Sequence, residues 1–207
     1  MFSLEKEEIR KAVVILREGG VVVFPTETAY GIAADATNSR AVEKVMAIKG
    51  RATGKAPPLI VADLKMAEKY ALLSPIFDQL ISSFWPGPLT IISPIRKEST
   101  LSPLVVQDNT IAIRVSSHPI AHALSQALNV PIVATSANLA GKPECYDLTS
   151  VKKQFKTQKL QPDFYIDCGV LKKRLSSTIV AEKNGCIVVL RKGDIEITPR
   201  LHDFMTP

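Results

Sequence analysis

The sequence predicts an α/β protein in which packed helices cover a twisted, mixed β-sheet. Stretches with apolar residues three and four positions apart, typical of helices, alternate with short runs of β-branched and aromatic residues, typical of strands. Around Ser74 two helical stretches follow one another, and near the C-terminus Asn184-Gly185 favours a tight hairpin between two strands. Because these features break a strict strand–helix–strand alternation, we expect both parallel and antiparallel strands in the sheet.

Six segments are predicted to be helices, from the spacing of their apolar residues and from residues that favour helix ends. Asp63 and Asp147 are placed to cap two of them, and Ser74 stands before a proline at the first position of a third. Gly50 is placed to end another. The predicted helices span residues 5–18, 39–48, 63–72, 74–84, 119–128 and 147–155.

Eight segments are predicted to be strands, because each is short, apolar and rich in β-branched residues. They span residues 21–24, 58–61, 89–93, 110–115, 131–134, 163–167, 177–181 and 186–190.

The strand at residues 110–115 alternates most clearly between apolar and other side chains. Successive side chains of a strand point to opposite faces, so its two faces can be assigned from the sequence. The apolar face carries Ile111, Ile113 and Val115, and the opposite face carries Thr110, Ala112 and Arg114. We expect the first face to lie in the core and the second to lie outside it.

The chain has 207 residues, 46% of them hydrophobic, and can therefore bury a substantial core. We expect a single domain over residues 1–207, with its core at about 5–195 and a short C-terminal tail. The net charge of +6 favours anionic partners such as nucleotides or RNA.

The cysteine pattern and the N-terminus predict a cytoplasmic protein with no membrane partner. Cys145, Cys168 and Cys186 are widely spaced, form no C-x-x-C pair and are odd in number, which fits a reducing compartment. The first residues are charged, and no apolar run approaches the roughly 18 residues of a membrane span.

Polar residues follow two of the predicted strands. Pro25 ends the first strand, and residues 26–31 then supply two hydroxyls, a phenol and a glycine. Residues 135–138 form a similar polar exit from a later strand. Convergent hydroxyls at strand ends can orient a small polar substrate. The alternative is an ordinary exit in which these residues only form turns.

Several familiar catalytic motifs are missing from the sequence. There is neither a Walker phosphate loop nor a G-x-G-x-x-G motif. His118 and His122 lack a third ligand, so His118 is better explained as a helix cap, and Ser136 lacks the context of a nucleophile elbow. Lys49 and Arg51, two residues apart, can grip a polyphosphate or two carboxylates.

Four motifs, taken together and in this order, resemble the YrdC-like threonylcarbamoyl-AMP synthase family. The resemblance extends from about residue 20 to residue 193. The motifs are Phe24-Pro25-Thr26-Glu27-Thr28-Ala29-Tyr30-Gly31, Lys49-x-Arg51, Trp85-Pro86-Gly87-Pro88-Leu89-Thr90 and Ser136-x-Asn138. It implies a twisted mixed α/β sheet around a basic cavity.

The resemblance also implies a reaction and its partners. Members make threonylcarbamoyl-adenylate and pyrophosphate from L-threonine, bicarbonate and ATP, with Mg²⁺ on the triphosphate and no metal bound by the protein. A tRNA threonylcarbamoyl transferase then moves the threonylcarbamoyl group to the adenosine next to the anticodon of certain tRNAs. Direct binding of tRNA is a further expectation.

The residues that match the family's functional positions fall into two groups by substrate. The threonine group is Thr28, Tyr30, Arg114, Ser136 and Ser177. The nucleotide group is Lys49, Arg51, Thr110, Asn138 and Arg191. Within the second group, Lys49 and Arg51 are expected to be catalytic because they supply positive charge where two anionic reactants meet.

Two other readings of the sequence stay open. One is an RNA-binding or ribosome-maturation module of the same fold, favoured by the net charge and by the basic tract at residues 152–159. No stacking-aromatic motif supports it, and only 6% of residues are aromatic. The other is the carbamoyl-transfer domain of hydrogenase-maturation proteins, which shares this fold.

Overall fold

The structure is a computed structural model that describes residues 2–50 and 55–197, with side chains from residue 6 onward. Within these ranges the helices are α1 (Phe2–Arg17), α2 (Ser39–Ile48), α3 (Leu64–Tyr70), α4 (Asp78–Phe84), α5 (Pro119–Leu128) and α6 (Leu148–Phe155), and two short 3₁₀ helices are η1 (Pro75–Phe77) and η2 (Pro103–Val105). The strands are β1 (Val22–Pro25), β2 (Tyr30–Ala33), β3 (Leu59–Val61), β4 (Leu89–Pro94), β5 (Thr110–Val115), β6 (Ile132–Val133), β7 (Thr135–Ser136), β8 (Phe164–Tyr165), β9 (Thr178–Lys183) and β10 (Cys186–Arg191).

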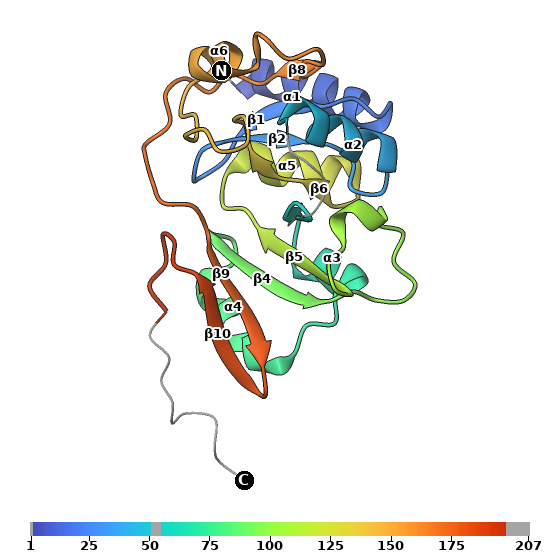
Figure 1. Cartoon of the computed structure of the whole chain (residues 1–207), viewed down its shortest axis with the longest axis vertical. Helices are drawn as coiled ribbons and strands as arrows, with labels where there is room; N and C mark the ends of the chain where they lie inside the picture. Colours follow the sequence, from blue (N-terminus) through green and yellow to red (C-terminus); the bar gives the residue numbers. More distant parts are fainter. Residues whose placement is uncertain (1, 51–54, 198–207) are drawn as a thin grey trace.

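The described strands form two mixed sheets (Figure 1). The predicted mixed α/β fold is confirmed, but the strands are divided between two sheets where one had been expected. The four-stranded sheet has the order β7-β2-β1-β8, and the six-stranded sheet has the order β10-β9-β4-β5-β3-β6. In the first sheet β1 pairs antiparallel with β2 and parallel with β8. In the second, β4 pairs antiparallel with β5 and parallel with β9.

The ends of several helices agree with the local signals in the sequence. Helices α2 and α5 have the predicted bounds, and the side chains of Asp63 and Asp147 accept bonds from backbone amides as N-caps. His118 caps α5 through its Nδ1, as expected. Gly50 follows α2 with a φ of +59°, a conformation in which glycine is favoured.

The predicted helix start at Ser74 is wrong in one respect. Ser74 makes no side-chain cap bond, and α4 begins only at Asp78. Pro75 fixes the backbone for a tight turn, so η1 forms first, with a bond of 3.0 Å from the Phe77 amide to the Ser74 carbonyl.

The two predicted polar strand exits are themselves built largely from strands, which corrects the expectation of open loops. Residues 30–33 turn back on β1 as β2, and residues 135–136 form β7, which pairs with β2. These strands have four and two residues, too few for a clear alternation in the sequence. Strand β2 pairs with its neighbour β1 and with β7, which is distant in sequence, and this pairing supplies the order that local propensity does not.

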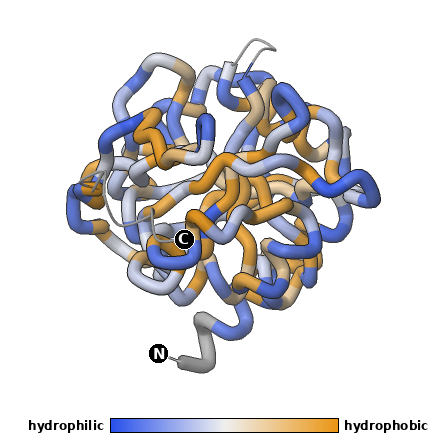
Figure 2. Tube along the Cα trace, turned by 90° about the horizontal axis from the view of Figure 1, so that it is seen from below, coloured by the Kyte–Doolittle hydropathy of each residue, from blue (hydrophilic) through white to orange (hydrophobic). Residues whose placement is uncertain are grey.

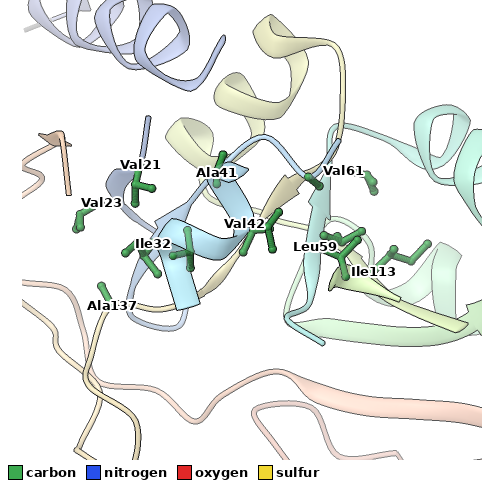
Figure 3. Close-up of a cluster of buried hydrophobic side chains, with 14 of the residues drawn as sticks. Val21, Val23, Ile32, Ala41, Val42, Leu59, Val61, Ile113 and Ala137 are labelled. Carbon is green, nitrogen blue, oxygen red and sulfur yellow. The ribbon is translucent and has the colours of Figure 1, made fainter. Parts of the chain in front are cut away.

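Helix α2 packs between the two groups of strands. Figure 3 shows Ala41 and Val42 of this helix between Val23 and Ile32 on one side and Leu59 on the other. All five are buried in one hydrophobic cluster. The Cα trace in Figure 2 has its hydrophobic segments toward the middle and hydrophilic loops toward the rim. This shared core holds the two sheets at fixed positions and so shapes the space between them.

Two connections in the C-terminal half of the chain bring β9 and β10 into place. The segment after β8 runs along one edge of the molecule from the four-stranded sheet to β9 (Figure 1). The predicted hairpin between β9 and β10 is confirmed, with Asn184 and Gly185 at φ of 54° and 73°. Among the described residues, no helix is both long and apolar enough to cross a membrane.

Candidate active site

A cavity of about 1070 Å³ lies where residues of the two sheets face each other. This volume is at the upper end for small-molecule sites and can hold two substrates together. Its described lining carries cations and carboxylates, namely Lys55, Arg114, Lys183 and Arg191 against Asp108, Glu144 and Glu182. Hydroxyl groups complete the polar lining, from Thr26, Thr28, Tyr30, Thr110, Thr135, Ser136, Ser176 and Ser177.

Strand β5 forms one wall of the cavity, and its two faces are as predicted. Thr110, Ala112 and Arg114 line the cavity, whereas Ile111 and Ile113 are buried in the main hydrophobic cluster. The Thr110 hydroxyl donates to the carbonyl of residue 107 at 2.8 Å, which ties the turn before β5. The alternation of one strand therefore separates core from site.

The pairing of β2 with β7 brings the two predicted polar segments together. Gly31 lies opposite Ser136 in this antiparallel pair. The turn from β1 to β2 is held by Thr26, whose hydroxyl donates to the Ala29 carbonyl at 2.7 Å and accepts from the Thr28 amide at 3.2 Å. Thr28 and Ser136 consequently border the same cavity.

Arg114 is paired with a carboxylate that the sequence analysis did not assign to the site. Its Nη1 donates to Glu27 Oε1, and Ser116 Oγ donates to the other oxygen of the same carboxylate. Arg114 and Glu27 have side chains that are only 8% and 10% exposed. Burial lowers the pKa of Arg114, and the charge of Glu27 and its hydrogen bond act in the opposite direction.

The sequence does contain a local signal that Glu27 and Arg114 need partners of opposite charge. The residue is an acid among the hydroxyls of the β1–β2 turn, and Arg114 is a cation on a strand that is otherwise apolar or small. Such a cation needs a nearby counter-charge when it is buried. Only the fold shows that the counter-charge comes from a turn 87 residues earlier in the chain.

Ser177 and Arg191 form a second polar cluster on the β9–β10 side. Arg191 Nη2 donates to the Ser177 carbonyl at 2.8 Å and to its hydroxyl at 3.0 Å. The buried Thr90 hydroxyl lies 2.8 Å from Ser177 Oγ. Desolvation lowers the pKa of Arg191, the charge of Glu144 raises it, and the charge of Arg114 lowers it. Two guanidinium groups thus lie at one cavity, and they differ because Arg114 has a carboxylate partner whereas Arg191 donates to Ser177.

Glu144 was also missing from the sequence-predicted site. It lines the cavity and accepts a bond of 2.9 Å from Ser176 Oγ, which joins the segment before α6 to the segment before β9. Tyr30 lines the cavity as expected, but its hydroxyl is engaged away from it. That hydroxyl donates to the Gly169 carbonyl and accepts from the Cys168 amide, both at 2.9 Å.

The expectation that Lys49 lines the cavity is not met, and Asn138 is not part of the lining either. Lys49 is buried, and its ammonium group donates to the carbonyls of Ser136 and Asn138. Asn138 Nδ2 donates to two carbonyls of its own loop. The ammonium donates to these backbone oxygens because a buried cation must replace the hydration that it has lost. Arg51 lies outside the described residues.

The Sua5/YciO/YrdC family model, described as "Telomere recombination", matches residues 14–193. The chain belongs to the Sua5/YciO/YrdC family.

Relatives in this family share a name that states an activity. A threonylcarbamoyl-AMP synthase of Photobacterium profundum is 40% identical over 152 residues, which cover 72% of this chain and 81% of that protein. The Bacillus subtilis protein of the same name is 37% identical over 199 residues, which cover 93% of this chain and 55% of that protein.

A solved relative shows the same fold with a small molecule bound. The crystal structure of P. abyssi Sua5 complexed with L-threonine matches with a TM-score of 0.82 and 33% identity. The match covers 89% of this chain and 54% of that chain. This chain therefore spans about half the length of the P. abyssi and B. subtilis relatives.

Proposed function

We propose that this member of the Sua5/YciO/YrdC family is a threonylcarbamoyl-AMP synthase, which makes threonylcarbamoyl-adenylate and pyrophosphate from L-threonine, bicarbonate and ATP. The observation that carries the proposal is the cavity, in which Arg114 and Arg191 lie among the hydroxyls of Thr28, Ser136 and Ser177. The shared name of the relatives and the threonine in the P. abyssi structure support it.

The chemistry explains why such a site needs cations. The threonine amine adds to CO₂ from bicarbonate to give a carbamate, whose oxygen bonds to the α-phosphorus of ATP as the bond to pyrophosphate breaks. Two like charges 4 Å apart repel by about 4 kcal/mol at an effective dielectric constant of about 20. Arg114 and Arg191 reduce this repulsion without any covalent step on the protein. Mg²⁺ enters with the triphosphate as part of the substrate.

The two substrates use different residues of the cavity. Arg114 receives the threonine carboxylate, and the hydroxyls of Thr28, Ser136 and Ser177 surround the threonine side chain and amine. Arg191 and Thr110 receive the nucleotide. Arg114 on β5 and Arg191 on β10 line the same cavity from different strands, which supports this division. The reaction is then mainly one of positioning and charge stabilisation.

Lys49 and Asn138 support the site through hydrogen bonds, although neither is a lining residue of the cavity. The bonds from Lys49 to the carbonyls of Ser136 and Asn138 fix the loop that follows β7 and so place the Ser136 hydroxyl at the cavity. We assign Lys49 a positioning role in this state of the protein, and its charge still adds to the field that an incoming polyphosphate meets.

The product is a mixed anhydride of a carbamate and AMP, which a second enzyme must use. We assign that step to a tRNA threonylcarbamoyl transferase in the cytoplasm, acting on the adenosine next to the anticodon. The net charge of +6 is compatible with a transient approach to tRNA. Residues 1–207 form the single catalytic unit in this proposal.

Pyrophosphate release is expected to require threonine and bicarbonate together, because the attacking carbamate forms only from both. The assay follows pyrophosphate at saturating Mg²⁺-ATP while each of the two is left out in turn. Serine and valine serve as control amino acids, since one lacks the methyl group of threonine and the other lacks its hydroxyl. Cleavage of ATP at the same rate without threonine would refute the proposed reaction.

Arg51→Ala is expected to reduce kcat/KM by an amount equal to about 2–4 kcal/mol of transition-state stabilisation, the usual loss for one preorganised donor. The physical reason is the loss of one cation that offsets the charge of the two reactants. Arg40→Ala, which removes an exposed arginine from α2, is the matched control and should turn over like the parent. If the Arg51→Ala variant has the kinetics of the parent, Arg51 is a solvated surface residue with no role in the reaction.

A further inference from the structure

We propose that Glu27 is a positioning residue that sorts threonine and polyphosphate between the two guanidinium groups of the cavity. Its carboxylate orients the Arg114 guanidinium for the threonine carboxylate, and its charge keeps polyphosphate away from Arg114. The identity of the substrates rests on the proposed function. The electrostatic role of Glu27 does not.

Glu27 contacts the Arg114 guanidinium but is not itself a lining residue of the cavity. Arg114 does line the cavity, and its Nη1 donates to Glu27 Oε1. Ser116 Oγ donates to the second carboxylate oxygen and itself accepts from the His118 amide at 3.2 Å. Both oxygens of Glu27 are thus engaged, and the carboxylate is fixed in orientation.

The backbone of Glu27 is fixed as well. It lies at the tip of the β1–β2 turn, where the Thr26 hydroxyl accepts from the amides of residues 28 and 29 at 3.2 and 3.3 Å. The Thr26 and Thr28 hydroxyls are 3.0 Å apart. Movement of Glu27 would therefore break this turn, and Arg114 is held against a rigid support.

The charge of Glu27 distinguishes the two substrates. Threonine is a zwitterion with no net charge, so it gains little from an additional positive charge in the cavity. Pyrophosphate and the ATP triphosphate carry several negative charges and gain much more. A neutralised Arg114 therefore favours the amino acid. Arg191 forms no ion pair among the described residues and donates to Ser177 instead, so it attracts phosphate more strongly than Arg114 although the charge of Glu144 also acts on it.

Glu27→Gln tests the proposal because it removes the charge while keeping the size and polarity of the side chain. Binding is measured by calorimetry with L-threonine alone and with inorganic pyrophosphate alone. We expect the pyrophosphate Kd to fall about tenfold and the threonine Kd to rise about tenfold. A merely structural role would change the melting temperature and leave the ratio of the two Kd values unchanged, which would overturn the proposal.

Ser116→Ala separates orientation from charge, since it removes one bond to Glu27 and leaves the carboxylate in place. We expect weaker threonine binding and an unchanged pyrophosphate Kd. An unchanged threonine Kd in this variant would overturn the positioning role, even where Glu27→Gln fails to fold.

Asp163→Asn is the matched control. Asp163 accepts from Lys44 and from the Val21 amide at 2.7 Å and lies outside the cavity, so its loss should affect stability alone. If the parent protein binds no threonine, the proposed function fails. The pyrophosphate Kd values of the parent and Glu27→Gln still test the charge role of Glu27. Equal pyrophosphate affinities in parent and Glu27→Gln, or none in either, would overturn the charge role.

Discussion

Arg114→Ala is expected to lower the free energy of unfolding by about 3–5 kcal/mol and to reduce kcat/KM at least a hundredfold. The stability loss arises because Glu27 keeps its buried carboxylate and loses the cation that compensates it. The activity loss arises because the proposed partner of the threonine carboxylate is gone. Urea unfolding and pyrophosphate release measure the two effects separately.

The double variant Glu27→Ala/Arg114→Ala is the matched control for these two effects. Removal of both charges should restore most of the stability, since no unpaired charge is left buried, but it should not restore activity. Arg114→Lys keeps the charge and loses the planar fork that grips a carboxylate with two parallel bonds. It should therefore raise the KM for threonine more than the KM for ATP. A stable, fully active Arg114→Ala variant would contradict both roles.

Ile113→Arg is expected to cost at least about 3–5 kcal/mol of stability, enough to prevent folding at moderate temperature. Ile113 is completely buried and lies between Leu59 of β3 and Ile91 of β4 in the six-stranded sheet. An arginine at this position would place an unpaired charge in the core. Thermal melting followed by circular dichroism measures the loss.

Ala112→Arg carries the same substitution on the opposite face of the same strand. Ala112 lines the cavity and is partly exposed, so the new side chain can reach solvent. This variant should melt close to the parent temperature and lose activity because the arginine occupies substrate space. If Ala112→Arg unfolds while Ile113→Arg melts like the parent, the two faces of β5 are assigned the wrong way round.

Features with strong local signals were predictable from the sequence. Strand β5 shows this best, because its two faces follow from strict alternation alone. Helix α5 begins at a proline, and the β9–β10 turn is an Asn-Gly pair, so each boundary is set by the residue that forms it. The resemblance to the family implied substrate-binding roles for Thr28, Ser136, Ser177 and Arg191, and all four line the cavity.

Features that depend on partners distant in sequence were not predictable. Strand β2 follows β1 after a four-residue turn, but its tetrapeptide YGIA carries no strand signal of its own. The division into two sheets has no local signal either, although the chain passes at Ala134 from β6 in one sheet to β7 in the other. The pairing of Glu27 with Arg114 and the inward turn of Lys49 arise only when both sheets are assembled.

The most direct test of the proposed function is to identify the nucleotide product by mass spectrometry, with ¹³C-bicarbonate as the only added source of CO₂. The protein is incubated with L-threonine, Mg²⁺-ATP and labelled bicarbonate, with Arg114→Lys in parallel at low threonine. We predict threonylcarbamoyl-adenylate that carries one labelled carbon in the carbamate, and much less of it from Arg114→Lys. An unlabelled adenylate, or AMP and pyrophosphate without any threonine-containing nucleotide from the parent protein, would contradict the account.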